Sequence, residues 1–301
     1  MSTTDDTLDD RIKNREDGDR VYYATGLLLD QEAFRVDQDY HRARLAAATA
    51  ALGGCGTLAG LSVAWDKTTD EIQVNPGVAL DRLGRIIELG TQACLRVAPW
   101  YAQIPSGTGR AYAGADVAKI LGVAASDATA VPSVIADVWI RFAVCERGKT
   151  PAFARGPFDA LDATAPSRLR DAYEIKLITR LEDPPLPKPY NPFSTLTLTG
   201  SASDKLTALK KFLVNNFTPT DPPQSNIKGY QSIMPDTPNS ALPAHASFDP
   251  NAVFLARVAI PVKSAGGSNL PDRDTTKNVV TYDAERPFVL TANSLALLMG
   301  T

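Results

Sequence analysis

The sequence predicts an α+β protein that is mainly β. Its N-terminal third carries one long helical pattern over Asp30–Leu52. Short apolar segments follow in which apolar and polar residues alternate, which is typical of strands in a sheet with one buried face. Proline (22) and glycine (20) are both plentiful, as expected for short strands joined by many turns. We therefore expect a long N-terminal helix packed on a small antiparallel sheet, followed by a larger β-rich region with one additional helix and long Pro-rich loops.

The chain divides into four predicted regions. Residues 1–20 are polar and mixed in charge, so they bury little and form a flexible N-terminal arm. Residues 21–98 form a helix plus β-hairpin module, and residues 99–181 form a β-rich middle region. Residues 182–301 contain a Pro-rich linker, a helix and the C-terminal strands. A chain of 301 residues is long enough to bury a substantial core.

The long predicted helix has clear signals at both ends. Asp30 can cap its start, because the carboxylate accepts the free N–H groups of the first turn. Gly53 and Gly54 end it as left-handed C-terminal glycines. An apolar-to-aromatic stripe recurs at helical spacing along it, at Phe34, His41, Leu45, Ala48 and Leu52. Tyr40 and several alanines widen the stripe (Ala43, Ala47, Ala50 and Ala51), and this alanine-rich second half allows close approach of another helix or sheet. We expect this stripe to pack inside its own domain, with a contact between subunits as the alternative.

Three β segments are predicted after the helix: Thr57–Trp65, Glu71–Ala79 and Arg85–Val97. Residues 66–70 form a polar hairpin connection, and residues 81–84 form a turn that ends in glycine. Pro76-Gly77 interrupts the middle segment, where a proline belongs only at an edge or a bulge.

The rest of the chain has weaker but usable patterns. We predict a short turn before the Tyr173 strand, a loop over residues 149–157, and a long loop or partner-binding excursion over residues 218–250. Ser203 is the predicted cap of the later helix. The predicted helices are Ala115–Leu121 and Asp204–Phe217. The predicted strands are Val134–Glu146, Tyr173–Thr179, Val253–Val262 and Asn278–Asp283. The sequence then continues with an apolar segment at Arg286–Met299.

Charge and composition argue against several classes of protein. A net charge of -3 and a pI near 5.5 argue against an electrostatic nucleic-acid binder. No run approaches 18 apolar residues, so we expect no membrane span, and the N-terminus lacks the features of a secretory signal. Cys55, Cys94 and Cys145 are odd in number and lack metal-site spacing, so we expect buried, reduced thiols.

The motifs of common catalytic and cofactor sites are incomplete. Residues 107–112 lack the third glycine of a dinucleotide fingerprint. Gly60-Leu61-Ser62 begins like a nucleophile elbow but lacks the closing glycine. His41 and His245 have no second histidine at ligand spacing. We therefore predict no catalytic, cofactor-binding or metal-binding residues.

Carboxylates are numerous, and folding could bring a pair of them together. Solvation of a helix surface and of hairpins explains the group that lies close in the chain: Asp37, Asp39, Asp66, Asp70, Asp81 and Glu88. Asp272 and Asp274 lack the rest of a calcium-loop spacing.

One motif has a direct physical explanation. It runs from Pro76 to Ile87 as Pro-Gly-x-Ala-x-Asp-x-x-Gly-Arg-x-Ile. Pro76-Gly77 sets a tight bend, and Asp81 caps the turn that Gly84 closes. Arg85 then presents a fixed guanidinium at the start of the last strand, where it can pair with Asp81.

With this motif, the chain resembles a family of bacterial and phage proteins found with contractile tails and phage-tail-like injection systems. The runs that carry the resemblance are Gly26–Leu29, Gly54–Val63, Val74–Asp81, Gly84–Ile87, Trp139–Glu146, Tyr173–Leu177 and Val253–Ile260. The resemblance implies a virion component, a baseplate, fibre-anchoring or tail-peripheral subunit, assembled in the bacterial cytoplasm. Its partners would be copies of itself (a homo-oligomer) and other tail or baseplate proteins.

Two other functions stay open from the sequence. A carbohydrate- or cell-surface-binding module at a tail tip would need exposed aromatic residues gathered on one face. The candidates are Trp65, Trp100, Tyr101 and Tyr190. A hydrolase would need a carboxylate pair assembled by the fold, with Asp81 as a member.

Overall fold

The fold is described here from a computed structural model, and it is α+β and mainly β, as predicted. The residues that the structure describes are 20–105, 109–121, 123–124, 126, 130–151, 164–180, 199–215, 249, 251–266, 270–283 and 286–289. The predicted arm over residues 1–19, most of the 182–250 region and the apolar close after residue 289 lie outside them.

The long helix α1 spans Gln31–Gly53 and begins as predicted, whereas of the two glycines predicted to end it Gly53 is still helical and Gly54 alone has a positive φ. An oxygen of the Asp30 carboxylate accepts a hydrogen bond from the Ala33 N–H at 2.8 Å. Gly54 has a φ of 73°, and its N–H donates to the Ala50 carbonyl. At 1.5 Å per residue, the 23 residues of α1 extend about 34 Å.

Two small antiparallel sheets follow α1, with strand orders β1-β4-β5 and β2-β3-β6. Each of the three predicted β segments is broken in the middle and gives one strand to each sheet. The interruption predicted at Pro76-Gly77 is confirmed, but the predictions of a single small sheet and of unbroken first and third segments are wrong. Left-handed backbone at Gly60 and Leu61 (φ 67° and 58°) breaks the first, and Pro76 breaks the second. The strands are β1 (Gly56–Gly60), β2 (Val63–Asp66), β3 (Glu71–Val74), β4 (Gly77–Leu80), β5 (Ile86–Leu89) and β6 (Ala93–Arg96).

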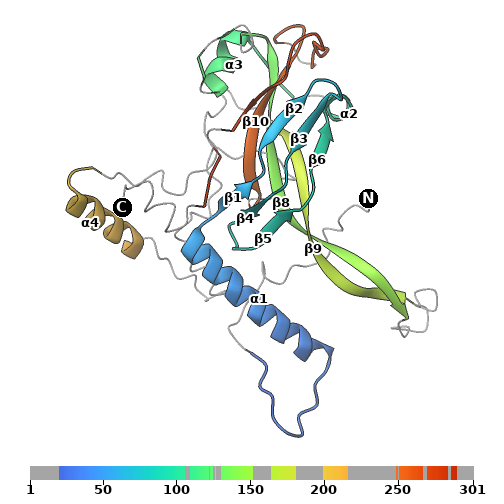
Figure 1. The fold of residues 1–301 in the computed structure, drawn as a ribbon, viewed down its shortest axis with the longest axis vertical. Helices are drawn as coiled ribbons and strands as arrows, with labels where there is room; N and C mark the ends of the chain where they lie inside the picture. Colours follow the sequence, from blue (N-terminus) through green and yellow to red (C-terminus); the bar gives the residue numbers. More distant parts are fainter. Residues whose placement is uncertain are drawn as a thin grey trace.

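A larger five-stranded antiparallel sheet lies behind the small ones (Figure 1). Its order is β11-β10-β8-β7, and β9 also pairs with β8. The strands are β7 (Ala111–Tyr112), β8 (Ser133–Pro151), β9 (Thr164–Thr179), β10 (Val253–Pro261) and β11 (Val280–Tyr282). Since β9 and β10 both pair with β8, the boundary predicted between residues 181 and 182 falls between strands of one sheet.

The predicted turn before Tyr173 and the predicted loop start at Lys149 are wrong. Both stretches are strand, because β8 and β9 pair with each other from Ala136↔Thr179 as far as Pro151↔Thr164. This long-range pairing overrides the weak local preference of these polar residues.

Three further helices are described: α2 (Val97–Ala102), α3 (Gly114–Leu121) and α4 (Ala202–Asn215). The short helix predicted at Ala115–Leu121 is confirmed as α3. Helix α4 is also confirmed, but its cap is Ser201 and not Ser203, because the Ser201 hydroxyl accepts from the Asp204 N–H. Within the described part of the chain, no helix combines the length and apolarity that a membrane crossing needs.

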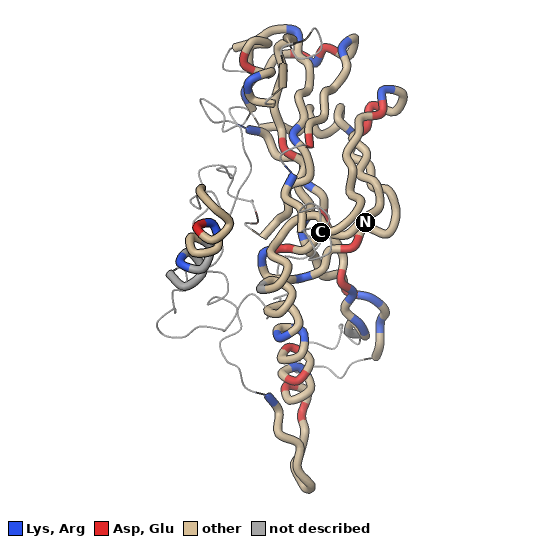
Figure 2. The backbone as a smooth tube through the Cα atoms, turned by 60° about the vertical axis from the view of Figure 1, so that its left-hand side comes forward, with Lys and Arg blue, Asp and Glu red and all other residues tan. Residues whose placement is uncertain are grey.

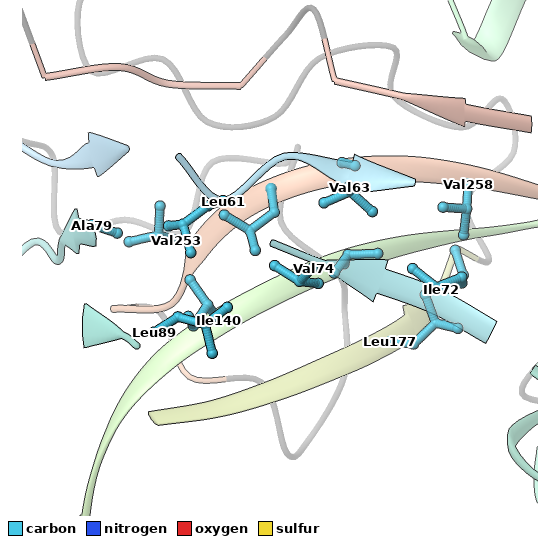
Figure 3. Packing of buried hydrophobic residues seen from close by; sticks show 14 of the residues in the cluster. Leu61, Val63, Ile72, Val74, Ala79, Leu89, Ile140, Leu177, Val253 and Val258 are labelled. Atoms are coloured by element: carbon cyan, nitrogen blue, oxygen red, sulfur yellow. The ribbon is translucent and has the colours of Figure 1, made fainter. Parts of the chain in front are cut away.

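One hydrophobic core joins all three sheets (Figure 3). Its buried side chains come from both small sheets and from the large sheet, including Ile72, Val74, Ile87, Leu89, Val138, Ile140, Leu177, Leu255 and Val258. The small sheets are therefore packed on the large one as parts of a single unit.

Candidate assembly surface

The motif turn between β4 and β5 is built around Asp81, which is completely buried. One Asp81 oxygen accepts from the Leu83 and Arg85 backbone N–H groups at 2.9 and 2.8 Å, and the other accepts from Arg85 Nε at 2.6 Å. The predicted pairing of Asp81 with Arg85 is confirmed. Arg85 is not presented outward, however. Only 5% of it is exposed, and its guanidinium stacks 4.6 Å from the Phe142 ring centroid on β8.

Gly84 lets α1 approach this turn closely. Its φ is +82°, and a Cβ there would overlap the carbonyl oxygen of Ala46. The Thr49 hydroxyl donates to the Gly84 carbonyl at 2.6 Å. Alanine side chains of α1 and Leu83 form a small buried cluster at the contact: Ala43, Ala46, Ala47 and Leu83. The helix is thus held on the body by its alanine face.

The predicted apolar stripe lies on the opposite side of α1 and is exposed. Phe34 is 55% exposed, Leu45 62% and Leu52 90%. His41 and Ala48 are exposed as well. The expectation that this stripe packs inside its own domain is therefore wrong for its large side chains, because close approach to the turn requires small ones. It holds for two alanines that widen the stripe, Ala43 and Ala47, and the predicted close approach of the alanine-rich half is confirmed.

Helix α1 and the residues before it extend away from the sheets (Figure 2). The exposed apolar surface continues into that segment, through Tyr22, Tyr23, Leu27 and Leu28. Large exposed apolar patches on a protein surface commonly mark interaction sites. The apolar side of α1 is therefore the first candidate surface for a partner.

A second projecting feature is the outer part of the β8–β9 ribbon (Figure 1). The last β8 residue that pairs with β10 is Ile140, and beyond it β8 pairs with β9. The outer residues are exposed, including Leu169. Basic side chains dominate there, at Arg147, Lys149, Arg168 and Arg170, beside the acidic Glu146 and Asp171.

The aromatic candidates for glycan binding do not form an exposed group. Trp65, Trp100 and Tyr101 are partly buried against the core. The Trp100 indole N–H donates to the Leu177 carbonyl at 2.8 Å, and the Tyr101 hydroxyl donates to the Pro271 carbonyl at 2.7 Å. Trp100 also lines a groove of about 360 Å³ beside β9, together with Leu95, Gln103, Ile104 and Ile175. Tyr190 lies outside the described residues.

Most of the candidate carboxylates have a partner of their own and do not pair with one another. Asp66 accepts from the Thr68 N–H and the Gln73 amide, and Asp70 binds Arg273 through two hydrogen bonds of 2.6 and 2.8 Å. On α1, Asp37 Oδ1 lies 3.7 Å from His41 Nε2, and Asp39 Oδ1 lies 3.7 Å from Arg42 Nη1. Glu88 is exposed on β5. Asp272 pairs with Lys263, and Asp274 accepts from Thr276. Across the described ranges, no three His, Cys, Asp or Glu side chains gather as a metal site would require.

The remaining candidate residues lie apart from one another. Ser62 accepts a hydrogen bond from the Asn75 amide, and His245 lies outside the described residues. All three cysteines are free, but the prediction that they are buried is wrong for Cys94, which is exposed on β6, and only partly right for Cys55 and Cys145, which are half-buried. Burial raises the pKa of the Cys55 thiol to about 11.

Sequence reasoning missed a buried ionic cluster in the large sheet. Asp137 on β8 is fully buried and accepts from Arg257 Nε at 2.7 Å and from Arg180 Nη1 at 3.2 Å. Arg257 also donates to the Ile120 carbonyl of α3. The available signal was a charged residue inside an otherwise apolar strand, as in VIADVWI. The cluster ties β8, β10 and α3 together.

Comparison with known proteins leaves the surface of α1 as the main functional clue. No protein-family model matches the chain, and no curated protein matches it either. What distinguishes the described structure is its own geometry: a helix that contacts the motif turn through its second half and has an exposed apolar side, and a projecting basic ribbon.

Proposed function

We propose that this protein is a structural subunit of a contractile phage tail or a phage-tail-like injection particle. It would act by assembly, as a baseplate, fibre-anchoring or tail-peripheral component. The Pro76–Ile87 motif supports this setting through its resemblance to tail-associated proteins. The observation that carries the proposal is the exposed apolar side of α1, with Phe34, Leu45 and Leu52 at 55%, 62% and 90% exposure.

Exposed leucine and phenylalanine side chains on a firmly held helix favour an assembly role. Burying each such side chain against a partner contributes about 1.5–3 kcal/mol. The Asp81–Arg85 turn holds α1 on the body, so the apolar surface is presented without much cost in ordering the helix. The basic β8–β9 ribbon offers a second point of contact with a neighbouring protein.

Co-purification with tail particles tests the proposal. The tagged full chain is expressed with the sheath, tube and baseplate genes of its own genome, and assembled particles are separated on a density gradient. We expect the tagged chain in the particle fractions. A matched preparation without the sheath and tube proteins should leave it in the soluble fractions. A chain that stays in the soluble fractions in both preparations contradicts the proposal.

A further inference from the structure

The exposed side of α1 follows a coiled-coil spacing. Its residues recur in alternating steps of four and three, which matches the d and a positions of a heptad repeat. We call this set the α1 seam: Phe34, Gln38, His41, Leu45, Ala48 and Leu52. All six residues are exposed. Together with Gln31, at the preceding a position, the pattern covers three heptads of helix.

The buried side of α1 lies away from the seam, although Thr49 and Arg42, at e positions beside the seam, also contact the body. Ala43, Ala46 and Ala47 are buried against Leu83, and they fall at the outer f, b and c positions of the same heptads. A partner helix can therefore bind the seam while the alanine side remains on the motif turn.

We propose that a second copy of this chain binds along the α1 seam, with the two helices parallel and in register. Asp37 and Arg42 flank the seam at g and e positions, and their side chains are 32% and 41% exposed. In a parallel pair, each g residue faces the e residue of the partner's next heptad. Asp37 of one copy then faces Arg42 of the other, twice across the pair.

The charges favour the parallel arrangement over the antiparallel one. In an antiparallel pair, e positions face e positions and g positions face g positions, so Arg35 would face Arg42 while Asp37 would face Arg44. The repulsive and attractive contacts then offset each other, whereas the parallel pair has only the attractive Asp37–Arg42 contacts. Charge complementarity therefore selects the parallel pair, and it also selects a second copy of this chain as the partner.

This inference takes from the proposed function only the biological setting, a tail particle. It deepens that function because it names one partner, a second copy of the chain. It can be tested on the isolated chain. The particle experiment above can succeed while the seam fails, or the reverse, so the two proposals fail separately.

Light scattering after size exclusion tests the seam on the full chain. For the unmodified protein, we expect the mass of at least two chains, each of which has a mass of 32.2 kDa. Leu45→Glu places a charge in the seam of both copies and should weaken association at least about 100-fold, giving a monomer. Leu206→Glu, at an exposed leucine of α4, is the matched control and should keep the larger mass.

Cysteine cross-linking tests the orientation. Gln38→Cys and Leu52→Cys, made separately, place a thiol near each end of the seam. Only in a parallel, in-register pair does each of these two positions lie next to the same position of the other copy. Both variants should therefore form a disulfide-linked dimer on mild oxidation. The unmodified chain, with its three free cysteines, and Leu206→Cys should not.

Charge reversal gives an independent check. Asp37→Arg should weaken association, and adding Arg42→Asp should restore it, because the facing pair is then reversed and intact. A monomeric unmodified protein overturns the inference, as does a Leu45→Glu variant that keeps the larger mass. If the unmodified protein is a monomer and Leu45→Glu lowers its free energy of unfolding, the inference is also overturned, because the seam would then be covered by another part of the same chain.

Discussion

Asp81 and Gly84 are the two residues of the motif turn whose chemistry is most demanding. Asp81 is a buried carboxylate with two backbone donors and the Arg85 guanidinium around it. Gly84 has left-handed backbone directly against the Ala46 carbonyl. Both residues act inside the protein, where they are buried or packed against α1. Their role is to hold α1 and the strands in place.

Asp81→Asn should destabilise the fold by about 3 kcal/mol or more, because it leaves the buried Arg85 guanidinium without its countercharge. Urea unfolding measured by circular dichroism checks this. Asp272→Asn removes an exposed pair with Lys263 and should leave the unfolding midpoint nearly unchanged. Equal effects of the two substitutions would show that the turn is not a structural anchor.

Gly84→Ala should cost about 2 kcal/mol or more, since the new Cβ meets the Ala46 carbonyl at a φ of +82°. The same urea titration measures it. Gly90→Ala is the control, because a Cβ at Gly90 has no atom within 4 Å. If Gly84→Ala were as stable as Gly90→Ala, α1 would not be docked on the turn as described.

At the scale of elements, side-chain links between distant loops hold the small sheets in place. Asp70, in the β2–β3 hairpin, binds Arg273 just before β11. Asp70 has a φ of 54°, a left-handed conformation that aspartate and asparagine tolerate well. Arg286 donates to the Leu255 carbonyl of β10 and the Gly60 carbonyl of β1. The Asp70–Arg273 and Arg286–Gly60 links join residues 203 and 226 positions apart in the chain, and the Arg286–Leu255 link joins residues 31 apart.

The Asp70–Arg273 link should make stability depend on pH. The Arg273 hydrogen bonds lower the pKa of Asp70 from its ordinary 3.8. The ionised carboxylate therefore stabilises the fold above about pH 4, and this contribution is lost as the pH falls through the lowered pKa. Asp70→Asn should lower the urea midpoint at pH 7 and have a smaller effect at pH 3. If Asp70→Asn lowered the urea midpoint by the same amount at both pH values, the stabilising role given to the ionised Asp70 carboxylate would be contradicted.

Strand boundaries show why local patterns predicted the elements only in part. Alternation in Thr57–Trp65 was correctly assigned to strand, but its division between β1 and β2 depends on the positive φ of Gly60 and Leu61. Leucine rarely adopts a positive φ, so the sequence of this segment does not predict a break at Leu61. Local sequence also failed to predict strand at Arg168 and Leu169, whose conformation comes from pairing with β8.

At the scale of the whole molecule, the three sheets share one hydrophobic core. Side chains of β3, β5, β8 and β10 meet in it, and Arg85 extends from the small sheet β1-β4-β5 to Phe142 of β8. A shared core makes independent unfolding of the small sheets costly, because it would expose the buried side of the large sheet.

The protein should therefore unfold its sheets in one cooperative transition. Far-ultraviolet circular dichroism and tryptophan fluorescence should give the same urea midpoint, since Trp65 lies in a small sheet and Trp139 in the large one. Two separated midpoints would show that the small sheets form an independent unit.

The sequence by itself determined the fold class, the ends of α1, the Asp81–Arg85 pair and most of the long strands. These depend on local periodicity, capping and turn chemistry, which neighbouring residues control. Only the tertiary structure decided which side of α1 faces the body. The apolar stripe looked like the buried side, but Gly84 and Thr49 bring the helix so close that only alanines fit there. The large apolar residues are left outside, where they are available to a second copy.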